Sequence, residues 1–576
     1  MTLPPGRVDQ VSEELPSGQS DQAGVFVTRG VGRAALLIGG LTVVARVLGF
    51  VRTLAFAGTV KTSCLGAAYV TANQVPNVIY DIVLGGALTA IVVPVLAGPA
   101  DRSARSDEAR SQVSATSSAL LTWTVVILAP VSLVLALVAN PVISALMPAN
   151  PRSGCAVASL APIAARMLEV FAPQILLYGL AVVLYGVLQA HRKFTAPALA
   201  PILSSVVVIV AYGLFVPLGS QHTTHVAGLS SAAELTLSAG TTLGVAALML
   251  TALGPVWRLR LRLRPALRFP DGIARRARSL AGVGVAALAA QDASVLVVTR
   301  LANAHGGSHG SAVAVFSYGW QVFVSVYAVL AIPIAISAFP VLAARKGAEF
   351  DEAAASATRA TALASCLGAA LLAGAAVPVA RAFPELSHAV AGQFALALAA
   401  FAPGLVGYGL TACLSRVLLA EGRNRAAVIP MVVGWLVVIG VDVAAVPLVS
   451  ANSVVPVLGL ANTVGMTVSG VALLVAVGRT RGAAALRGSA RAIGAGLAGA
   501  VAGAAAGLAL TAAVPVTWGH WLNAGLAVAA GICAGVAFCV VVAVLDGGDL
   551  RSVLSRVRRR WAPGDRPPEP PRRVAP

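Results

Sequence analysis

Two arginines, Arg46 and Arg52, are the residues of this chain best suited to bind a ligand. They lie in the stretch 45–52 (ARVLGFVR), within a long apolar run. A charge is costly inside a membrane unless it faces a polar cavity, so charges in such a run are functional candidates. A guanidinium offers paired N–H donors that match phosphate. The pair therefore predicts an anion site. The alternative is that Arg52 reaches the membrane surface and Arg46 has a structural role.

The spacing of the two arginines limits how they could cooperate. Six residues correspond to about 9 Å along a helix and about 120° around it. They would share one cavity only if the helix bends, and Gly49 is the bend point that the sequence offers.

The other predicted intramembrane ionisable residues are more easily explained by pairing with one another. Arg166 and Glu169 are three residues apart on one predicted helix, and Asp292 and Arg300 are eight apart on another. Asp81 follows Pro76 and Asn77 and is a candidate counter-ion for Arg46 or Arg52. We regard each pairing as the first explanation, with a role in transport as the second.

The sequence contains no catalytic signature. A phosphate-binding GxxxxGK[ST] loop, an HExxH motif and a GxSxG motif are all absent, and no carboxylates or histidines have metal-ligand spacing. None of the six cysteines forms a CxxC pair, and we interpret all of them as small buried apolar residues: Cys64, Cys155, Cys366, Cys413, Cys533 and Cys539. The sequence predicts a protein that is not an enzyme and binds no metal or cofactor.

The elements that must position these residues are membrane-spanning helices. Of the 576 residues, 58% are hydrophobic and only 11% are charged, which excludes an ordinary soluble enzyme. The apolar residues fall into long blocks, and only helices or closed barrels can span lipid. Fourteen segments are expected to be helical: 34–58, 67–97, 116–138, 160–189, 197–217, 233–256, 279–302, 311–343, 358–380, 389–418, 427–448, 455–477, 490–513 and 519–546.

The distribution of basic residues predicts the orientation. The even-numbered connections contain 22 Lys and Arg residues and the odd-numbered ones contain three, so the even-numbered connections and both termini are expected in the cytoplasm. This bias, together with attraction to anionic lipid headgroups, accounts for the net charge of +19 without a nucleic-acid partner. The first 33 residues have no apolar core, so no cleavable signal peptide is expected.

The expected organisation places a basic linker at the middle of the chain. Residues 257–278 contain eight arginines and separate helices one to six (34–256) from helices seven to twelve (279–477). Two further helices follow in 478–548. The tails 1–33 and 549–576 are expected to be disordered and cytoplasmic. We expect two six-helix lobes with two appended helices.

Several motifs resemble those of the MurJ/MviN lipid II flippases. In addition to ARVLGFVR, these are QVPN at 74–77, GGAL and VVPVLA at 85–97, LQAHRKF at 188–194 with Pro197 and Pro201, Ser317-Tyr318 with Pro340, and AEGR at 420–423 with Pro430. The resemblance runs over most of the chain. It implies the fold of the multidrug/oligosaccharidyl-lipid/polysaccharide exporters, with two pseudo-symmetric lobes, alternating access, and a groove for a polyprenyl tail at the last two helices.

By this resemblance, Arg46 and Arg52 would hold the diphosphate of an undecaprenyl-linked peptidoglycan precursor in the bacterial cytoplasmic membrane. Further polar candidates for the cavity are Asn77, Tyr80, Asp81, Asp292, Arg300 and Gln321. The chain departs from the family pattern at four charged positions, which are Ala67, Tyr80, Gln321 and Val324 here. Three functions follow, in order of preference: a divergent flippase, a carrier of another lipid-linked or amphipathic substrate, or a non-transporting scaffold that binds cell-wall synthesis or division proteins.

Overall fold

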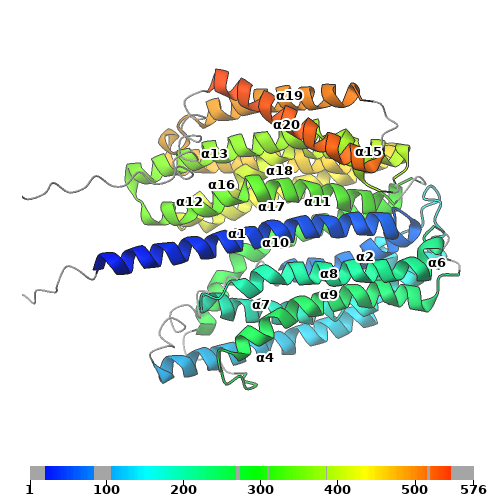
Figure 1. Ribbon diagram of the computed structural model, residues 1–576, viewed down its shortest axis with the longest axis horizontal. Coiled ribbons are helices and arrows are strands. Elements are labelled where there is room, and N and C mark those ends of the chain that lie inside the picture. The colour runs from blue at the N-terminus through cyan, green and yellow to red at the C-terminus, as the bar shows by residue number, and fades with distance from the viewer. Residues whose placement is uncertain are drawn as a thin grey trace, which may run out of the picture.

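The protein is a bundle of long helices that run roughly parallel to one axis (Figure 1). The computed structural model describes residues 20–82, 106–224, 226, 228–267, 273–307, 311–384, 386–514 and 519–546. Within these residues there is no β-strand, which confirms the all-α prediction. The tail from 549 onward and the GGAL and VVPVLA motifs lie outside the described residues.

The helices up to the linker are α1 (Ser20–Thr59), α2 (Cys64–Asp81), α4 (Asp107–Leu137), α5 (Ala139–Leu146), α6 (Val157–Phe171), α7 (Gln174–Ala190), α8 (Thr195–Gly219) and α9 (Ser231–Trp257). We call them the first group. The second group comprises α10 (Ile273–His305), α11 (Ala312–Leu330), α12 (Ile332–Ala344), α13 (Gly347–Gly374), α14 (Ala376–Ala382), α15 (His388–Phe401), α16 (Gly404–Ala420), α17 (Asn424–Ala445) and α18 (Val454–Arg481). The last pair is α19 (Ser489–Ala512) and α20 (His520–Leu545).

Each of the fourteen apolar segments contains helix, but the described residues do not confirm the predicted count of fourteen membrane spans. Within the described residues, 12 helices are long and apolar enough to cross a membrane, or 13 if the bent pair α15–α16 is one span. The segment predicted at 67–97 is helical as α2, and its continuation beyond residue 82 lies outside the described residues. Helix α1 begins at Ser20, well before the predicted start of the span at 34, and residues 1–19 are outside the described part.

Two predicted spans are broken at a proline, and a neighbouring hydroxyl compensates for each break. Proline has no N–H to donate, so the carbonyl groups around it need other partners. Before Pro173, between α6 and α7, the Ser132 hydroxyl donates to the Ala172 carbonyl at 2.7 Å. At Pro403, between α15 and α16, Thr463 Oγ1 donates to the Ala400 carbonyl at 2.6 Å. These contacts let an irregular backbone remain inside the bundle.

The two broken spans also share a sequence and an ending. The tripeptide Phe-Ala-Pro occurs at 171–173 and again 230 residues later at 401–403. Helix α7 ends with Arg192 at φ 58° and α16 ends with Gly422 at φ 74°, which are equivalent positions in the two copies. In each copy the next backbone N–H bonds back to a leucine carbonyl, Leu188 or Leu418, at 2.8 or 2.9 Å. This internal repeat, which our sequence reasoning missed, supports the proposed division into two lobes.

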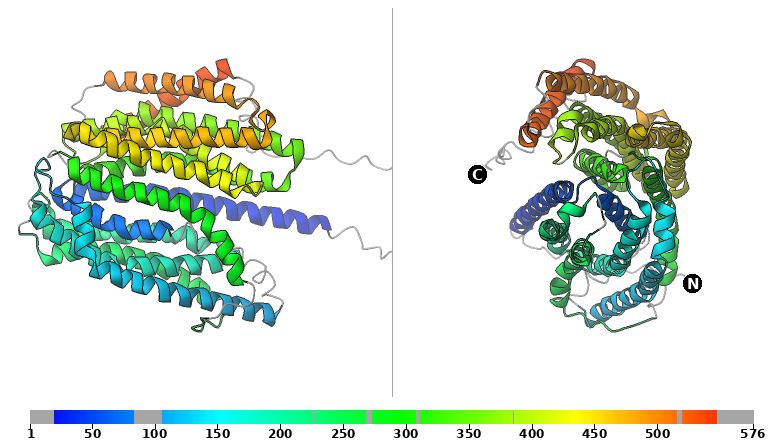
Figure 2. Two further views of the ribbon diagram at one scale, coloured as in Figure 1. Left: turned by 180° about the vertical axis from the view of Figure 1, so that it is seen from behind. Right: turned by 90° about the vertical axis from the view of Figure 1, so that its right-hand side faces the viewer.

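Small residues let the last pair pack against the second group. Helices α19 and α20 contact each other and α13, at the edge of the bundle away from α1 (Figure 2). A Cβ on Gly507 would lie 2.7 Å from the Cα of Gly374, and one on Gly503 would lie 2.6 Å from the Ala534 carbonyl oxygen. Only glycine permits such close approach of backbones, which is typical of helix pairs in membranes.

Candidate functional site

Arg46 and Arg52 both lie on α1, which runs through Gly49 as one uninterrupted helix. Arg46 is exposed and Arg52 is half-buried. Helix α1 packs mainly against α8, and Val43, Val47 and Val51 on α1 are 62%, 58% and 40% exposed. The two arginines therefore have different surroundings, and Arg52 is the one that the fold brings close to other polar groups.

Arg52 lies beside a network of buried tyrosines. It interacts electrostatically with Tyr69, Tyr178 and Tyr212, which belong to α2, α7 and α8. The Tyr69 hydroxyl is hydrogen-bonded to that of Tyr212 at 2.9 Å and to Thr241 Oγ1 at 2.7 Å. A cation next to aromatic hydroxyls inside a bundle makes an environment in which an anion can exchange its water shell for protein donors.

A second set of polar groups gathers around Asp81 at the end of α2. Asp81 interacts electrostatically with Tyr178 of α7, Asp292 of α10 and Tyr408 of α16. The neighbouring Tyr80 ring contacts the Tyr178 ring at an interplanar angle of 39°, with ring centroids 4.0 Å apart. Since Tyr178 also interacts with Arg52, these groups form one central cluster drawn from α1, α2, α7, α10 and α16. We call it the central cluster: Arg52, Tyr80, Asp81, Tyr178, Asp292 and Tyr408.

Two further predicted cavity residues, Asn77 on α2 and Gln321 on α11, are not part of the central cluster. Asn77 is half-buried on α2, one turn before Asp81. Gln321 on α11 is half-buried, and its Nε2 lies 3.4 Å from Ser325 Oγ on the same helix. Two of the positions that lack the family's charges, Ala67 on α2 and Val324 on α11, are buried and half-buried respectively.

Three predicted pairings of charges need revision. Arg166 pairs with Glu234 of α9 instead of Glu169, with Nε–Oε1 and Nη2–Oε2 distances of 3.0 and 2.8 Å. Arg300 is exposed and donates to the Ala145 carbonyl instead of approaching Asp292. The ion pairs within the described residues do not include Asp81, Arg46 or Arg52. The pairings were wrong because sequence spacing identifies neighbours along one helix, whereas these partners lie on another.

Sequence reasoning also overlooked two intramembrane charges, Asp442 on α17 and Arg416 on α16. Asp442 is fully buried, and neither of its carboxylate oxygens has a hydrogen-bond partner in the described part of the chain. Arg416 donates to the Ala412 carbonyl at 2.6 Å. Both could have been found by the rule that selected Asp292, a charge inside an apolar run. Groups of three potential metal ligands are absent among the described residues.

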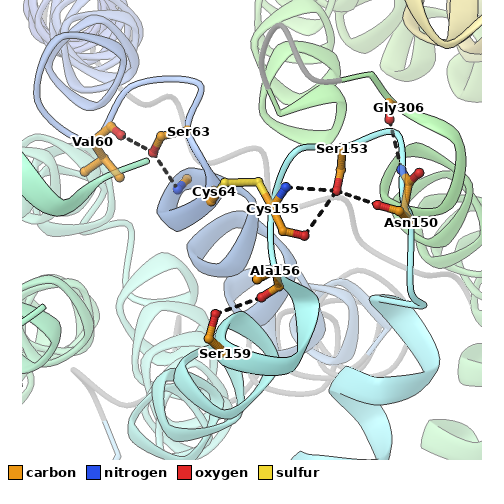
Figure 3. Close-up of a disulfide and its surroundings, with 10 residues drawn as sticks. Val60, Ser63, Cys64, Asn150, Ser153, Cys155, Ala156, Ser159 and Gly306 are labelled. Carbon is orange, nitrogen blue, oxygen red and sulfur yellow. Dashed lines mark hydrogen bonds between the residues drawn. A yellow bond between two sulfur atoms is a disulfide. The ribbon is translucent and has the colours of Figure 1, made fainter. Parts of the chain in front are cut away.

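The prediction that all cysteines are small buried apolar residues was wrong for Cys64 and Cys155, which form a disulfide (Figure 3). Cys64 begins α2, and Cys155 lies in the connection between α5 and α6. Cys366 and Cys413 are buried as expected, whereas Cys533 is half-buried and Cys539 is exposed. We call the end of the bundle with this bond the disulfide end.

The disulfide end also holds the two groups of helices together. Asn150 Nδ2 donates to the carbonyls of Asn303 and Gly306, both at 2.9 Å (Figure 3 shows the contact with Gly306). The Ser311 N–H donates to the Thr62 carbonyl at 2.8 Å. Further contacts run from Asn303 Nδ2 to Thr71 Oγ1 and the Leu146 carbonyl, and from Arg300 to the Ala145 carbonyl. We call these the seal. Within the described residues, every hydrogen bond between the two groups belongs to it.

The chain matches one family model, described as lipid II flippase MurJ, over residues 56–527. A protein of Burkholderia cenocepacia named lipid II flippase MurJ is 29% identical over 179 residues, which are 31% of this chain and 33% of that protein. A probable lipid II flippase MurJ of Synechocystis sp. is 27% identical over 260 residues, 44% of either chain. The matched segments thus span less than half of each relative.

Solved structures show the same fold. A lipid II flippase MurJ in an inward closed conformation superposes with a TM-score of 0.68 at 15% identity, covering 90% of this chain and all of the other. An inward-facing multidrug transporter of the MATE family gives a TM-score of 0.58 at 16% identity, covering 77% of this chain and 94% of the other. Both similarities place the helices of this chain in a transporter architecture.

Proposed function

This chain belongs to the lipid II flippase MurJ family, and from that premise we propose that it moves undecaprenyl-diphosphate-linked peptidoglycan precursor across the bacterial cytoplasmic membrane. The observation that supports this most directly is the position of Arg52 in the central cluster, where helices of both groups meet. The diphosphate is the part of the substrate that needs a cation, because two phosphates cannot leave water without charge-assisted hydrogen bonds. Arg52 supplies such bonds, and Arg46 extends the path along α1.

An apolar groove supports the proposal for the lipid tail. It has a volume of about 770 Å³ and lies between α13 and α20, where it is lined by Leu367, Leu371, Ile532, Val536 and neighbouring residues. Its lining is aliphatic apart from glycine, alanine and Cys539. A polyprenyl chain is a branched hydrocarbon, so such a groove can hold it by apolar contact while the headgroup passes between the two groups.

The seal supports alternating access as the mechanism. The two groups are joined by hydrogen bonds at the disulfide end, so breaking and reforming that set would expose and close the central cluster on one side of the membrane. We place the disulfide end outside the cell and both termini in the cytoplasm. Disulfides persist in oxidising compartments, and Cys64 and Cys155 lie in odd-numbered connections, which the basic-residue bias assigns to the outside.

The central cluster also favours a second candidate, transport of a different lipid-linked substrate. Where the family pattern has a cation, this chain has Tyr80, and its ring contacts that of Tyr178. Two acids also belong to the central cluster: Asp81, which interacts with Tyr178, and Asp292, which interacts with Asp81. A cluster with one guanidinium and two carboxylates would hold a diphosphate less tightly than one with several cations, so a substrate with less phosphate charge fits these residues better.

Complementation separates the candidates. The full chain, expressed in a strain depleted of its own lipid II flippase, should sustain growth, and the purified chain in liposomes should move labelled lipid II between leaflets. The Arg52→Ala variant should fail in both assays, whereas Arg152→Ala, which changes an exposed arginine in the α5–α6 connection, should behave like the unmodified chain. Movement of an undecaprenyl lipid other than lipid II would support the second candidate. Failure to move any lipid would contradict both and favour a scaffold.

A further inference from the structure

The beginning of the basic linker is an ordered strap on the side of the bundle. Residues 258–260 form a turn at the end of α9, and residues 261–267 then run along α4, at the lower edge of Figure 1. The backbone N–H groups of Arg262, Arg264 and Ala266 donate to Ser114 Oγ, Ser118 Oγ and Thr122 Oγ1 at 3.2, 3.0 and 3.0 Å. Trp123 Nε1 then donates to the Leu267 carbonyl at 3.0 Å.

We call these three backbone contacts the ladder. They form because the repeat distances of the helix α4 and of the strap are nearly equal. Four residues of an α-helix advance about 6 Å, and two residues of an extended chain advance about 6.7 Å. A hydroxyl on every fourth residue of α4 can therefore meet every second N–H of the strap. The backbone of the strap is fixed at three successive points, and the direction of its side chains is fixed with it.

The strap separates its side chains by polarity. Leu259 and Leu261 pack on a buried cluster of α4 and α7 that contains Val113, Leu120 and Val183. The alternating residues Arg260, Arg262 and Arg264 are all exposed. All three line the same hollow beside the start of α4, and we call this group of guanidiniums the arginine ridge.

The arginine ridge has an excess of positive charge. It borders a hollow of about 790 Å³ that is also lined by Asp107 and Arg110 at the start of α4. Asp107 is paired with Arg110 at 3.8 Å, and no residue of the ridge forms an ion pair with any of the described residues. The charge of the ridge is thus available to an anion.

The surroundings of the ridge indicate that this anion belongs to a lipid. Trp257, at the end of α9, is 85% exposed, and Leu263 and Leu267 of the strap are 39% and 60% exposed. On α4, beyond the ladder, Val126 and Ile127 are 47% and 53% exposed. Exposed tryptophan next to apolar surface is typical of the membrane interface. The arginine ridge therefore matches the headgroup of a lipid, and the exposed apolar residues beside it match the acyl chains.

We propose that the arginine ridge is a headgroup site for an anionic phospholipid of the inner leaflet, whose phosphate is held by Arg260, Arg262 and Arg264 and whose chains lie along α4. The site shares no residue with the central cluster, and it does not depend on the proposed function. It holds the linker between the two groups against the membrane surface.

The test measures how much lipid the full chain retains in detergent, by native mass spectrometry. Cardiolipin and phosphatidylglycerol are the anionic probes, and phosphatidylcholine is the zwitterionic reference. The triple variant R260Q/R262Q/R264Q should bind the anionic lipids about tenfold or more weaker, since each basic residue near the surface contributes roughly a factor of five. The triple variant R260K/R262K/R264K should keep most of the binding. If the lysine variant binds and the glutamine variant does not, the loss is due to the missing charge and not to a defect in folding.

Two matched variants separate the contribution of the arginine ridge to lipid binding from the effect of the net charge of the protein. R345Q/R425Q/R479Q removes three exposed arginines elsewhere and should leave anionic-lipid binding within about twofold of the unmodified chain. S114A/S118A/T122V keeps every charge but removes the acceptors of the ladder, and should weaken binding severalfold. Equal losses in the ridge and control variants, equal retention of phosphatidylcholine and cardiolipin, or displacement of the lipid by millimolar inorganic phosphate would each overturn the proposal.

Discussion

Cys64 and Cys155 are joined by a disulfide that ties the first turn of α2 to the α5–α6 connection, 91 residues further along the chain. The same connection contains Asn150, which donates both of the hydrogen bonds that reach the carbonyls of Asn303 and Gly306. The disulfide therefore holds in place the segment of the first group that closes against the second. It connects a covalent constraint within one group to the contacts between the groups.

Loss of the disulfide should lower stability. The double variant C64A/C155A should lose roughly 2–5 kcal/mol of unfolding free energy, because the bond restricts the unfolded chain across a long loop. Thermal unfolding of the purified protein in detergent, with and without reductant, measures this. The control C533A/C539A removes two free cysteines and should behave like the unmodified chain, unfolding at the same temperature without reductant and at a lower temperature with it, whereas C64A/C155A should not respond to reductant. An equal response of the two variants to reductant would contradict the role of the disulfide.

Asn150→Asp should weaken the seal. A carboxylate has no N–H to donate and would face the carbonyls of Asn303 and Gly306, at a cost of roughly 1–3 kcal/mol per unsatisfied buried group. The open fraction should therefore rise about tenfold or more, because about 1.4 kcal/mol corresponds to a factor of ten. The rate at which an impermeant maleimide labels A302C measures it, since Ala302 is buried beside a pocket at the disulfide end. Asn424→Asp, at the exposed start of α17, should leave the rate unchanged.

Both arginines of α1 should be needed for transport, but their substitution should lower lipid II affinity to different extents. Arg52→Ala and Arg46→Ala should both abolish transport while folded protein remains in the membrane, and Arg52→Lys should recover only part of the activity because an ammonium lacks the fork geometry. The half-buried position of Arg52 predicts the larger loss of lipid II affinity for that residue. Normal flipping by the doubly substituted chain would remove the anion site from the mechanism.

Restoring cations in the central cavity should strengthen substrate binding. The double variant Y80R/Q321R should bind lipid II more tightly and complement a flippase-depleted strain better than the unmodified chain, since each charge-assisted hydrogen bond contributes roughly 1.5–3 kcal/mol. Part of this gain will be offset by Asp81, which lies next to residue 80. Native mass spectrometry and growth of the depletion strain measure the two effects. Strong complementation by the unmodified chain, with no gain from the double variant, would refute this account of the cavity.

The orientation can be tested with single cysteines. Cysteines introduced in 217–232 or 302–311 should react with an impermeant reagent added outside the cell, whereas one at Pro265 in the strap should react only after the membrane is opened. Labelling of residue 265 from outside would invalidate both the predicted topology and the assignment of the strap to the inner leaflet.

The sequence alone determined the class of fold and the approximate positions of the helices. Lipid offers no hydrogen-bond partners, so an apolar run of sufficient length must be helical whatever its neighbours are. This argument predicted fourteen spans, of which the described residues contain 12, or 13 if the bent pair α15–α16 is one span. It did not reveal the interruptions at Pro173 and Pro403, because a proline within a span is tolerated only where a neighbour such as Ser132 or Thr463 satisfies the freed groups.

The partners of the polar residues were decided by tertiary structure. Arg166 was assigned to Glu169 from spacing but pairs with Glu234, 68 residues away, and Cys64 pairs with Cys155 although no local pattern marks either residue. The selection of Arg52 and Asp81 as polar candidates needed only their charge inside apolar runs. Their membership in one central cluster depended on how α1, α2, α7, α10 and α16 pack, because hydrophobic periodicity specifies which residues are buried but not which helices become neighbours.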